Sequence, residues 1–190
     1  MKNYAIFVIV SLAAFAQDKP NFSGHWLLDH AKSDFGDFPT PDTQTSVIEH
    51  KGADIKLVQT VKGDAVVGGE ASMERRYTTD GKETVNRIGQ SDAKSVAQWD
   101  GRKLIIETKL DTPNGTVVIA DSWELAEGGK ELMVSREIRG PDASQRQRFI
   151  YNKQESGSDL EAKAVAENAL PEWRNSATLR GSAGRCCTPI

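Results

Sequence analysis

The sequence predicts an all-β protein, an antiparallel up-and-down barrel of eight to ten strands followed by a short C-terminal helix. Apolar and polar residues alternate, as at Val117, Ile119, Trp123 and Leu125. This period of two is typical of antiparallel strands with one face in water. The strand-like segments are also joined by tight turns such as residues 79–82, which carry the Asp-Gly pair that hairpins favour. Closing such a meander into a barrel removes its exposed edges, so we expect closure.

The first 16 residues are predicted to be a cleaved signal peptide outside the fold. Lys2 supplies a positive charge, residues 5–15 form an apolar run, and Ala14 and Ala16 fit the small-x-small cleavage pattern. The apolar run is shorter than the roughly 20 residues that a membrane-spanning helix needs. We therefore expect cleavage after Ala16, a secreted or periplasmic protein, and no membrane span in the mature chain. The alternative is that these residues form a buried strand or helix.

The barrel domain is predicted over residues 17–154. Its strand-like segments alternate with turn residues along the whole range. An irregular stretch after the first segment contains Phe35 and Phe38, which we expect to pack down as a lid on the barrel. The clearest segments are residues 22–28, 44–50, 55–62, 70–78, 104–110, 116–125, 131–139 and 145–153.

The C-terminal part differs in character from the barrel. Residues 155–172 read as a linker and a short helix, because Ser158 and Glu161 have capping-box spacing and Pro171 ends the pattern. Residues 173–190 show no periodicity and are expected to be disordered. The only cysteines, Cys186 and Cys187, lie in this tail, so the barrel has no disulfide framework. We expect a monomer, with a dimer linked through Cys186 or Cys187 as the alternative.

Composition narrows the classes of function. The chain has 190 residues, 38% of them hydrophobic, with 24 Lys and Arg against 27 Asp and Glu. That length and composition suit one packed domain. A dedicated nucleic-acid-binding protein usually carries a strong basic excess, so no nucleic-acid partner is expected. The sequence contains no Gly-x-Ser-x-Gly element, P-loop or dinucleotide-binding fingerprint. We therefore predict no cofactor and no catalytic residue.

The segment from Asn21 to Leu28, followed by Lys32 to Gly36, resembles the opening of small secreted bacterial lipocalin-like (calycin-type) β-barrel proteins of largely unknown function. Gly24-x-Trp26 is also similar to the first signature of the wider lipocalin group. The likeness covers residues 20–153, although the Thr-Asp-Tyr signature of a later loop is not clear. The resemblance implies a lipocalin-like barrel able to hold an apolar molecule.

Several polar residues fall on otherwise apolar strand faces: Gln59, Asp121 and Arg136. They either line a cavity or pair with one another, unless a β-bulge shifts the register. Trp26 is either a core residue at the closed end of the barrel or a ligand contact, with Arg146 or Arg148 stacked on its indole. Arginines could also converge into a mouth that attracts an anionic head group, or simply face water. These arginines are Arg75, Arg76, Arg136, Arg139, Arg146 and Arg148.

We predict non-catalytic binding of a small apolar or amphiphilic molecule inside the barrel. The alternative is a filled barrel that contacts a protein or an envelope polymer through its surface, since small barrels can be filled by side chains. A hydrolase using Asp121 and Glu107 ranks lowest. His25, His30 and His50 are read as solvated residues, so no metal site is predicted. The residues predicted to contact the ligand are Trp26, Leu57, Gln59, Trp123, Val134, Arg136 and Arg148.

Overall fold

A computed structural model describes residues 18–63, 69–126, 128–141 and 143–155. Within them the chain forms one antiparallel sheet of ten strands, which confirms the predicted all-β class. The predicted signal peptide, helix, tail and cysteine pair all lie outside the described residues. The strands are β1 (Gly24–Leu28), β2 (Thr43–Lys51), β3 (Asp54–Lys62), β4 (Glu70–Thr78), β5 (Asp80–Ile88), β6 (Ser91–Asp100), β7 (Lys103–Thr112), β8 (Gly115–Leu125), β9 (Glu131–Arg139) and β10 (Ser144–Gln154).

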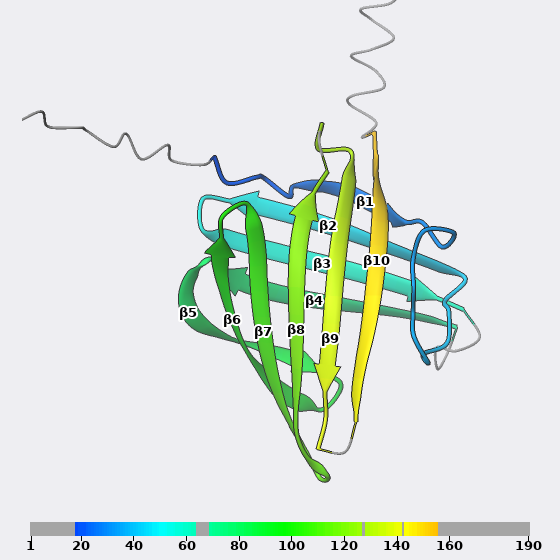
Figure 1. The fold of residues 1–190 in the computed structure, drawn as a ribbon, viewed down its shortest axis with the longest axis vertical. Coiled ribbons are helices and arrows are strands. Elements are labelled where there is room, and N and C mark those ends of the chain that lie inside the picture. The colour runs from blue at the N-terminus through cyan, green and yellow to red at the C-terminus, as the bar shows by residue number, and fades with distance from the viewer. Residues whose placement is uncertain (1–17, 64–68, 127, 142, 156–190) are drawn as a thin grey trace, which may run out of the picture. The chain divides into compact units, whose positions relative to one another are not determined.

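The sheet closes almost completely into a barrel. Every pair of consecutive strands is hydrogen-bonded except β4 and β5, and β1 also pairs with β10, so the order runs β4-β3-β2-β1-β10-β9-β8-β7-β6-β5. Figure 1 shows β2, β3 and β4 running across behind the upright strands β7 to β10, so that the two halves of the sheet face each other. The predicted up-and-down connectivity is confirmed.

The remaining gap lies between β4 and β5, which are the two ends of the strand order. The side-chain amide of Asn86 on β5 replaces ladder hydrogen bonds there. Its Oδ1 accepts from the Arg76 backbone N–H at 2.7 Å, and its Nδ2 donates to the Arg76 carbonyl at 2.9 Å. Because unpaired strand edges invite further pairing, this amide shields part of the open edge of β4.

The tight turns follow the predicted chemistry. Gly81 and Gly101 have φ values of 80° and 59°, in the left-handed region that residues with a Cβ seldom occupy. These turns fix the register of the strands they join, so that side chains alternate between the interior and the outside. The alternation is clear on β9, where Leu132 and Val134 are buried.

Aromatic residues of the core gather around the N-terminal segment. Phe22 is fully buried and stacks on His50 and Trp99, with ring centroids 5.9 and 5.8 Å away. Trp26, 1% exposed, donates its indole N–H to the Phe22 carbonyl at 3.0 Å. We call Phe22, Trp26, His50 and Trp99 the aromatic base.

The cation over the Trp26 indole is Lys153 and not Arg146 or Arg148. Its Nζ lies 5.4 Å from the ring centroid. A Cβ at Gly24 would lie only 2.6 Å from Lys153 Cε, so the glycine permits this close approach. Arg146 and Arg148 are both exposed. His50 is buried, which corrects the expectation that it would be solvated.

Candidate functional site

A cavity of about 210 Å³ lies inside the barrel, among the inward side chains of β2, β3, β4, β8, β9 and β10. Its wall has two kinds of side chain. The apolar part includes Ile48, Leu57, Trp123, Leu132, Val134 and Phe149. The polar part, which we call the polar chamber, consists of Gln44, Ser46, Gln59, Arg75, Asp121, Arg136 and Tyr151.

The structure brings five of the predicted ligand contacts together in this wall. They are Leu57, Gln59, Trp123, Val134 and Arg136. Trp26 instead lies in the aromatic base, in the core position that was its alternative interpretation. Arg148 lies on the outer face, because the alternation along β10 turns its neighbours Gln147 and Phe149 inward. The prediction of Arg148 in the cavity wall is therefore corrected.

Asp121 and Arg136 form a two-pronged ion pair in the wall. The two residues are register partners on β8 and β9, and the guanidinium donates Nε–H and Nη2–H to the two carboxylate oxygens at 2.7 and 2.8 Å. Burial alone lowers the pKa of Arg136, but the adjacent Asp121 carboxylate outweighs it, and the net effect raises that pKa. The sequence left open whether Asp121 and Arg136 line a cavity or pair with each other, and in the structure they do both.

A second group of hydrogen bonds centres on the hydroxyl of Tyr151. Gln44 donates its amide to this oxygen, and Gln59 Nε2 does so at 3.4 Å. Arg75 Nη1 in turn donates to Gln59 Oε1 at 3.3 Å. Burial raises the pKa of Tyr151, so the hydroxyl stays neutral.

Two groups in the same wall, Trp123 and Arg75, retain unused hydrogen-bond donors. The indole Nε1 of Trp123, a residue only 4% exposed, has no hydrogen-bond partner among the described residues. Arg75 forms no ion pair with any carboxylate of the described chain, and its guanidinium contacts only Gln59 Oε1 and, at 3.6 Å, Met73 Sδ. A buried donor without an acceptor is costly, as at Trp123, and a half-buried guanidinium without a carboxylate has donors to spare, so both groups can gain from a ligand that offers acceptors.

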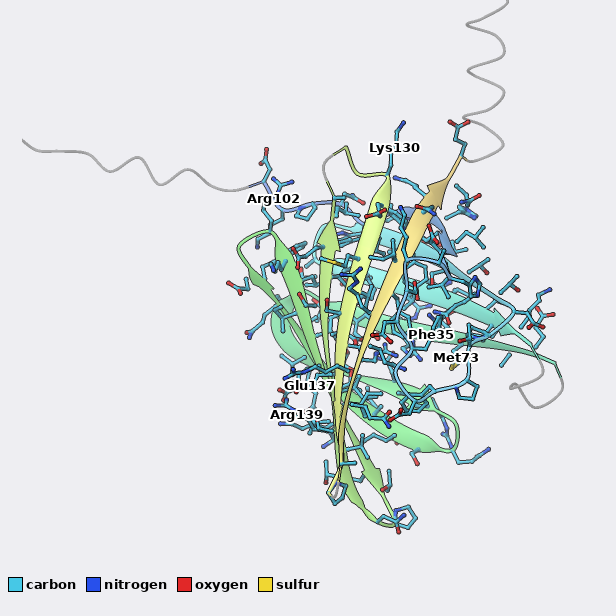
Figure 2. The ribbon with its side chains drawn as sticks, turned by 45° about the vertical axis from the view of Figure 1, so that its right-hand side comes forward. Phe35, Met73, Arg102, Lys130, Glu137 and Arg139 are labelled. Carbon is cyan, nitrogen blue, oxygen red and sulfur yellow. The ribbon has the colours of Figure 1, made fainter. Side chains whose placement is uncertain are left out.

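A second space lies next to the cavity, on the side of the loop of residues 29–42. This space of about 310 Å³ shares Gln44, Val61, Arg136 and Phe149 with the first and is also bounded by Phe35, Phe38, Pro39 and Pro41. Figure 2 shows Phe35 and Met73 away from the turns that carry Arg102 and Lys130. This second space is the outer part of the site.

The loop is fastened to β10 across this outer part. Asp34 and Arg148 exchange two backbone hydrogen bonds of 2.7 and 2.8 Å, and Gln147 Nε2 donates to the Phe35 carbonyl at 2.9 Å. Phe35 packs edge-on against Phe149 with centroids 5.5 Å apart, whereas Phe38 is 46% exposed. Of the two expected lid residues, Phe35 therefore packs down and Phe38 lies at the rim.

The arrangement offers no acid–base pair of the type considered for a hydrolase. Glu107 lies opposite Ala120 and points to the outer face, while the buried Asp121 faces inward. Glu107 pairs instead with Lys109 at 3.3 Å and Arg139 at 3.9 Å. The described part of the chain also holds no group of three or more His, Cys, Asp or Glu side chains placed to bind a metal. No helix in that part is long and apolar enough to cross a membrane.

Sequence reasoning missed several wall residues, namely Gln44, Ser46, Tyr77, Phe149 and Tyr151. Strict alternation on β10 would have found two of them, because inward Gln147 implies inward Phe149 and Tyr151. Arg75 was considered only as one of several arginines. Its neighbour Arg76 points outward, so the pair cannot converge as a unit.

Comparison with protein-family models and with curated proteins yields no match. Solved structures do match. An SAHS protein of Ramazzottius varieornatus gives a TM-score of 0.52 at 14% identity over 70% of this chain and 94% of that one. Zebrafish ileal bile acid-binding protein complexed with cholic acid gives a TM-score of 0.49 at 16% identity, and the match covers 70% of this chain and 98% of that one. SAHS protein 4 of R. varieornatus gives a TM-score of 0.43 at 15% identity, and the match covers 73% of this chain and 98% of that one.

At these identities the likeness is one of fold. The TM-score of 0.52 supports the calycin-like barrel that the sequence predicted. Bacterial origin and secretion stay predictions.

Proposed function

We propose that the protein is a non-catalytic binding protein that holds a small amphiphilic molecule inside its barrel. One observation carries the proposal: the interior retains about 210 Å³ behind a wall that is partly apolar and partly polar. A barrel filled by its own side chains would leave no such space, so the surface-interaction alternative has less support. A wall of this kind is typical of small-molecule sites, where a few polar groups fix the orientation of the ligand.

The binding free energy would come mainly from excluded water. The cavity has room for several waters. An apolar body that replaces them against Leu57, Trp123 and Val134 removes apolar surface from water. The polar chamber would then meet the polar end of the ligand.

We further infer that this function is exerted outside the cytoplasm. The support is the signal-peptide pattern of residues 1–16. The mass of the exported protein tests it, because cleavage after Ala16 leaves Gln17 as the first residue.

The test of binding is native mass spectrometry of the exported protein, purified without detergent, beside its denatured mass. We expect a native mass that exceeds the denatured mass by a discrete small-molecule increment. If the masses are equal, decanoate and decanol are titrated into the protein while tryptophan fluorescence is followed. A folded protein that responds to neither compound would overturn the proposal.

A pair of variants locates the ligand. Val134 lines the cavity, and Ser135 lies next to it on the opposite face of β9. Val134→Phe should fill the cavity and abolish the increment or the fluorescence response, whereas Ser135→Phe should leave both in place. Equal behaviour of the two variants would place the ligand elsewhere on the protein.

A further inference from the structure

We propose that the bound molecule is a monoanion and that Arg75 is its counter-ion. This inference rests on the proposed binding function and adds the charge and the orientation of the ligand. Arg75 lies on β4 opposite Leu57, and both side chains line the cavity.

Among the charged residues of the cavity wall, one cation, Arg75, has no carboxylate partner in the described part of the chain. Asp121 and Arg136 neutralise each other through their two short hydrogen bonds. Arg75 is the remaining charged residue of the wall, and no described carboxylate lies within ion-pair distance of it. Its neutral partners, Gln59 and Met73, use two of the five N–H donors of the guanidinium. A partly buried cation in this state gains from an anion, which a guanidinium can bind through two parallel hydrogen bonds.

The hydrogen-bond donors of the wall that lack an acceptor also favour an anionic ligand. Trp123 can only donate, and its Nε1–H has no acceptor. The Tyr151 hydroxyl already accepts from Gln44 and Gln59. A ligand group rich in acceptors, such as a carboxylate, therefore fits the wall, whereas an ammonium group would meet donors and a cation.

The placement of these donors gives the orientation. Trp123 packs edge-on against Tyr77 at 6.3 Å, and Tyr77 lies two residues from Arg75 on the same face of β4. The outer space toward the loop is lined mainly by apolar side chains, among them Phe35, Phe38 and two prolines, and its polar members are Gln44, Arg136 and Gln147. The anionic head would therefore lie inside, near Arg75 and Trp123, with the apolar tail directed toward the Phe35 loop.

The experiment compares decanoate with decanol, which share a ten-carbon chain and differ in charge. Binding to the mature protein is measured by isothermal titration at about pH 7.5, where a carboxylate is ionised. We expect Arg75→Gln to weaken decanoate by about tenfold or more, which corresponds to about 1.4 kcal/mol. Decanol affinity should change by no more than about twofold, since the alcohol needs no counter-ion.

Arg76→Gln is the matched control, because Arg76 is adjacent, points outward and has a side chain that is 68% exposed. It should leave both affinities unchanged. Arg75→Lys keeps the charge and should retain most of the preference for decanoate over decanol. If Arg75→Gln does not fold, Arg75→Lys is the variant compared with the unaltered protein. Trp123→Phe, which removes the second donor, should weaken decanoate more than decanol.

The outcomes separate the two proposals. If Arg75→Gln weakens both compounds equally, or neither, the counter-ion role of Arg75 is wrong while binding in the barrel stands. If decanol binds the unaltered protein as tightly as decanoate, the anionic ligand is also wrong. If the folded protein binds neither compound and carries no increment in its native mass, the proposed function itself fails.

Discussion

The aromatic base and the cavity wall belong to one barrel but differ in how fully their hydrogen-bond donors are satisfied. In the base, the Trp26 indole donates to the Phe22 carbonyl, and His50 Nδ1 accepts from the Phe22 backbone N–H at 3.3 Å. In the wall above it, the Trp123 indole has no acceptor, and Arg75 has no carboxylate. Two tryptophans of the same core thus differ in what they can offer a ligand.

This difference separates stability from binding. A satisfied, close-packed region contributes to the free energy of unfolding and offers nothing to a partner. An unsatisfied wall costs stability, and that cost is relieved when a ligand supplies the missing groups. Substitutions in the base should therefore change stability, whereas those of unmatched wall donors should change affinity.

The largest expected effect is on the base. Trp26→Ala should lower the free energy of unfolding by about 3–5 kcal/mol, because it leaves a cavity in a buried site. Trp123→Phe should change stability by less than about 1 kcal/mol, since it removes an unmatched donor. Urea unfolding followed by circular dichroism measures both. A cost for Trp123→Phe as large as that for Trp26→Ala would remove the distinction between the two regions.

The next effect concerns the ion pair of the polar chamber. Asp121→Asn should destabilise the protein by about 3 kcal/mol, because it leaves the Arg136 guanidinium without its carboxylate. The double variant Asp121→Leu with Arg136→Met should recover much of this loss by replacing charges with apolar groups. The single variants Asp121→Leu and Arg136→Met complete a double-mutant cycle, whose unfolding free energies give the coupling. Additive losses would show that the pair contributes no coupling energy.

Much of the fold could be predicted from the sequence because its signals are local. Alternation and Asp-Gly or Gly-Gly turns depend on near neighbours, and they gave the antiparallel meander correctly. The same alternation identified Gln59, Asp121 and Arg136 as inward polar residues, and the wall contains all three.

The site was harder to predict because it depends on register between distant strands. Whether Asp121 meets Arg136 or Glu107 depends on a one-residue choice of face, which inverts every side chain of a strand. Arg148 was predicted inward, although the inward residues of β10 are its neighbours. The Lys153–Trp26 contact joins residues far apart in the chain, and no local pattern indicates it.

A smaller effect is expected at the gap beside the cavity. Asn86→Ala should cost about 1–2 kcal/mol, because it removes two hydrogen bonds to the Arg76 backbone. The backbone amide of Arg76 should then exchange with solvent faster, as hydrogen-exchange mass spectrometry or NMR can measure. Asn114→Ala, in the exposed turn between β7 and β8, is the control. Unchanged exchange at Arg76 would mean that the amide does not close the gap.

The smallest expected effect is a pH dependence that arises in the aromatic base. Burial lowers the pKa of His50, although a backbone hydrogen bond with Gly52 opposes it, so the folded protein favours the neutral ring. The unfolded chain takes up this proton at about pH 6.5, whereas the folded chain does so only at lower pH. Between these two values the unfolded state binds more protons, so stability should fall as the pH is lowered and should rise again as the pH is raised.

The variant His50→Phe keeps an aromatic ring in the stack with Phe22 and Trp99 but cannot titrate. Its unfolding free energy should be lower at neutral pH, because the Phe22 N–H loses its acceptor, and should vary less between about pH 7 and pH 5. His25→Gln, at an exposed position, should keep the full slope. The pKa of Asp80 is held at about 2, mainly by its hydrogen bond from Lys82, so the contribution of this carboxylate is lost mainly below about pH 4. An unchanged slope in His50→Phe would assign the pH dependence to another group and leave the base without a titrating member.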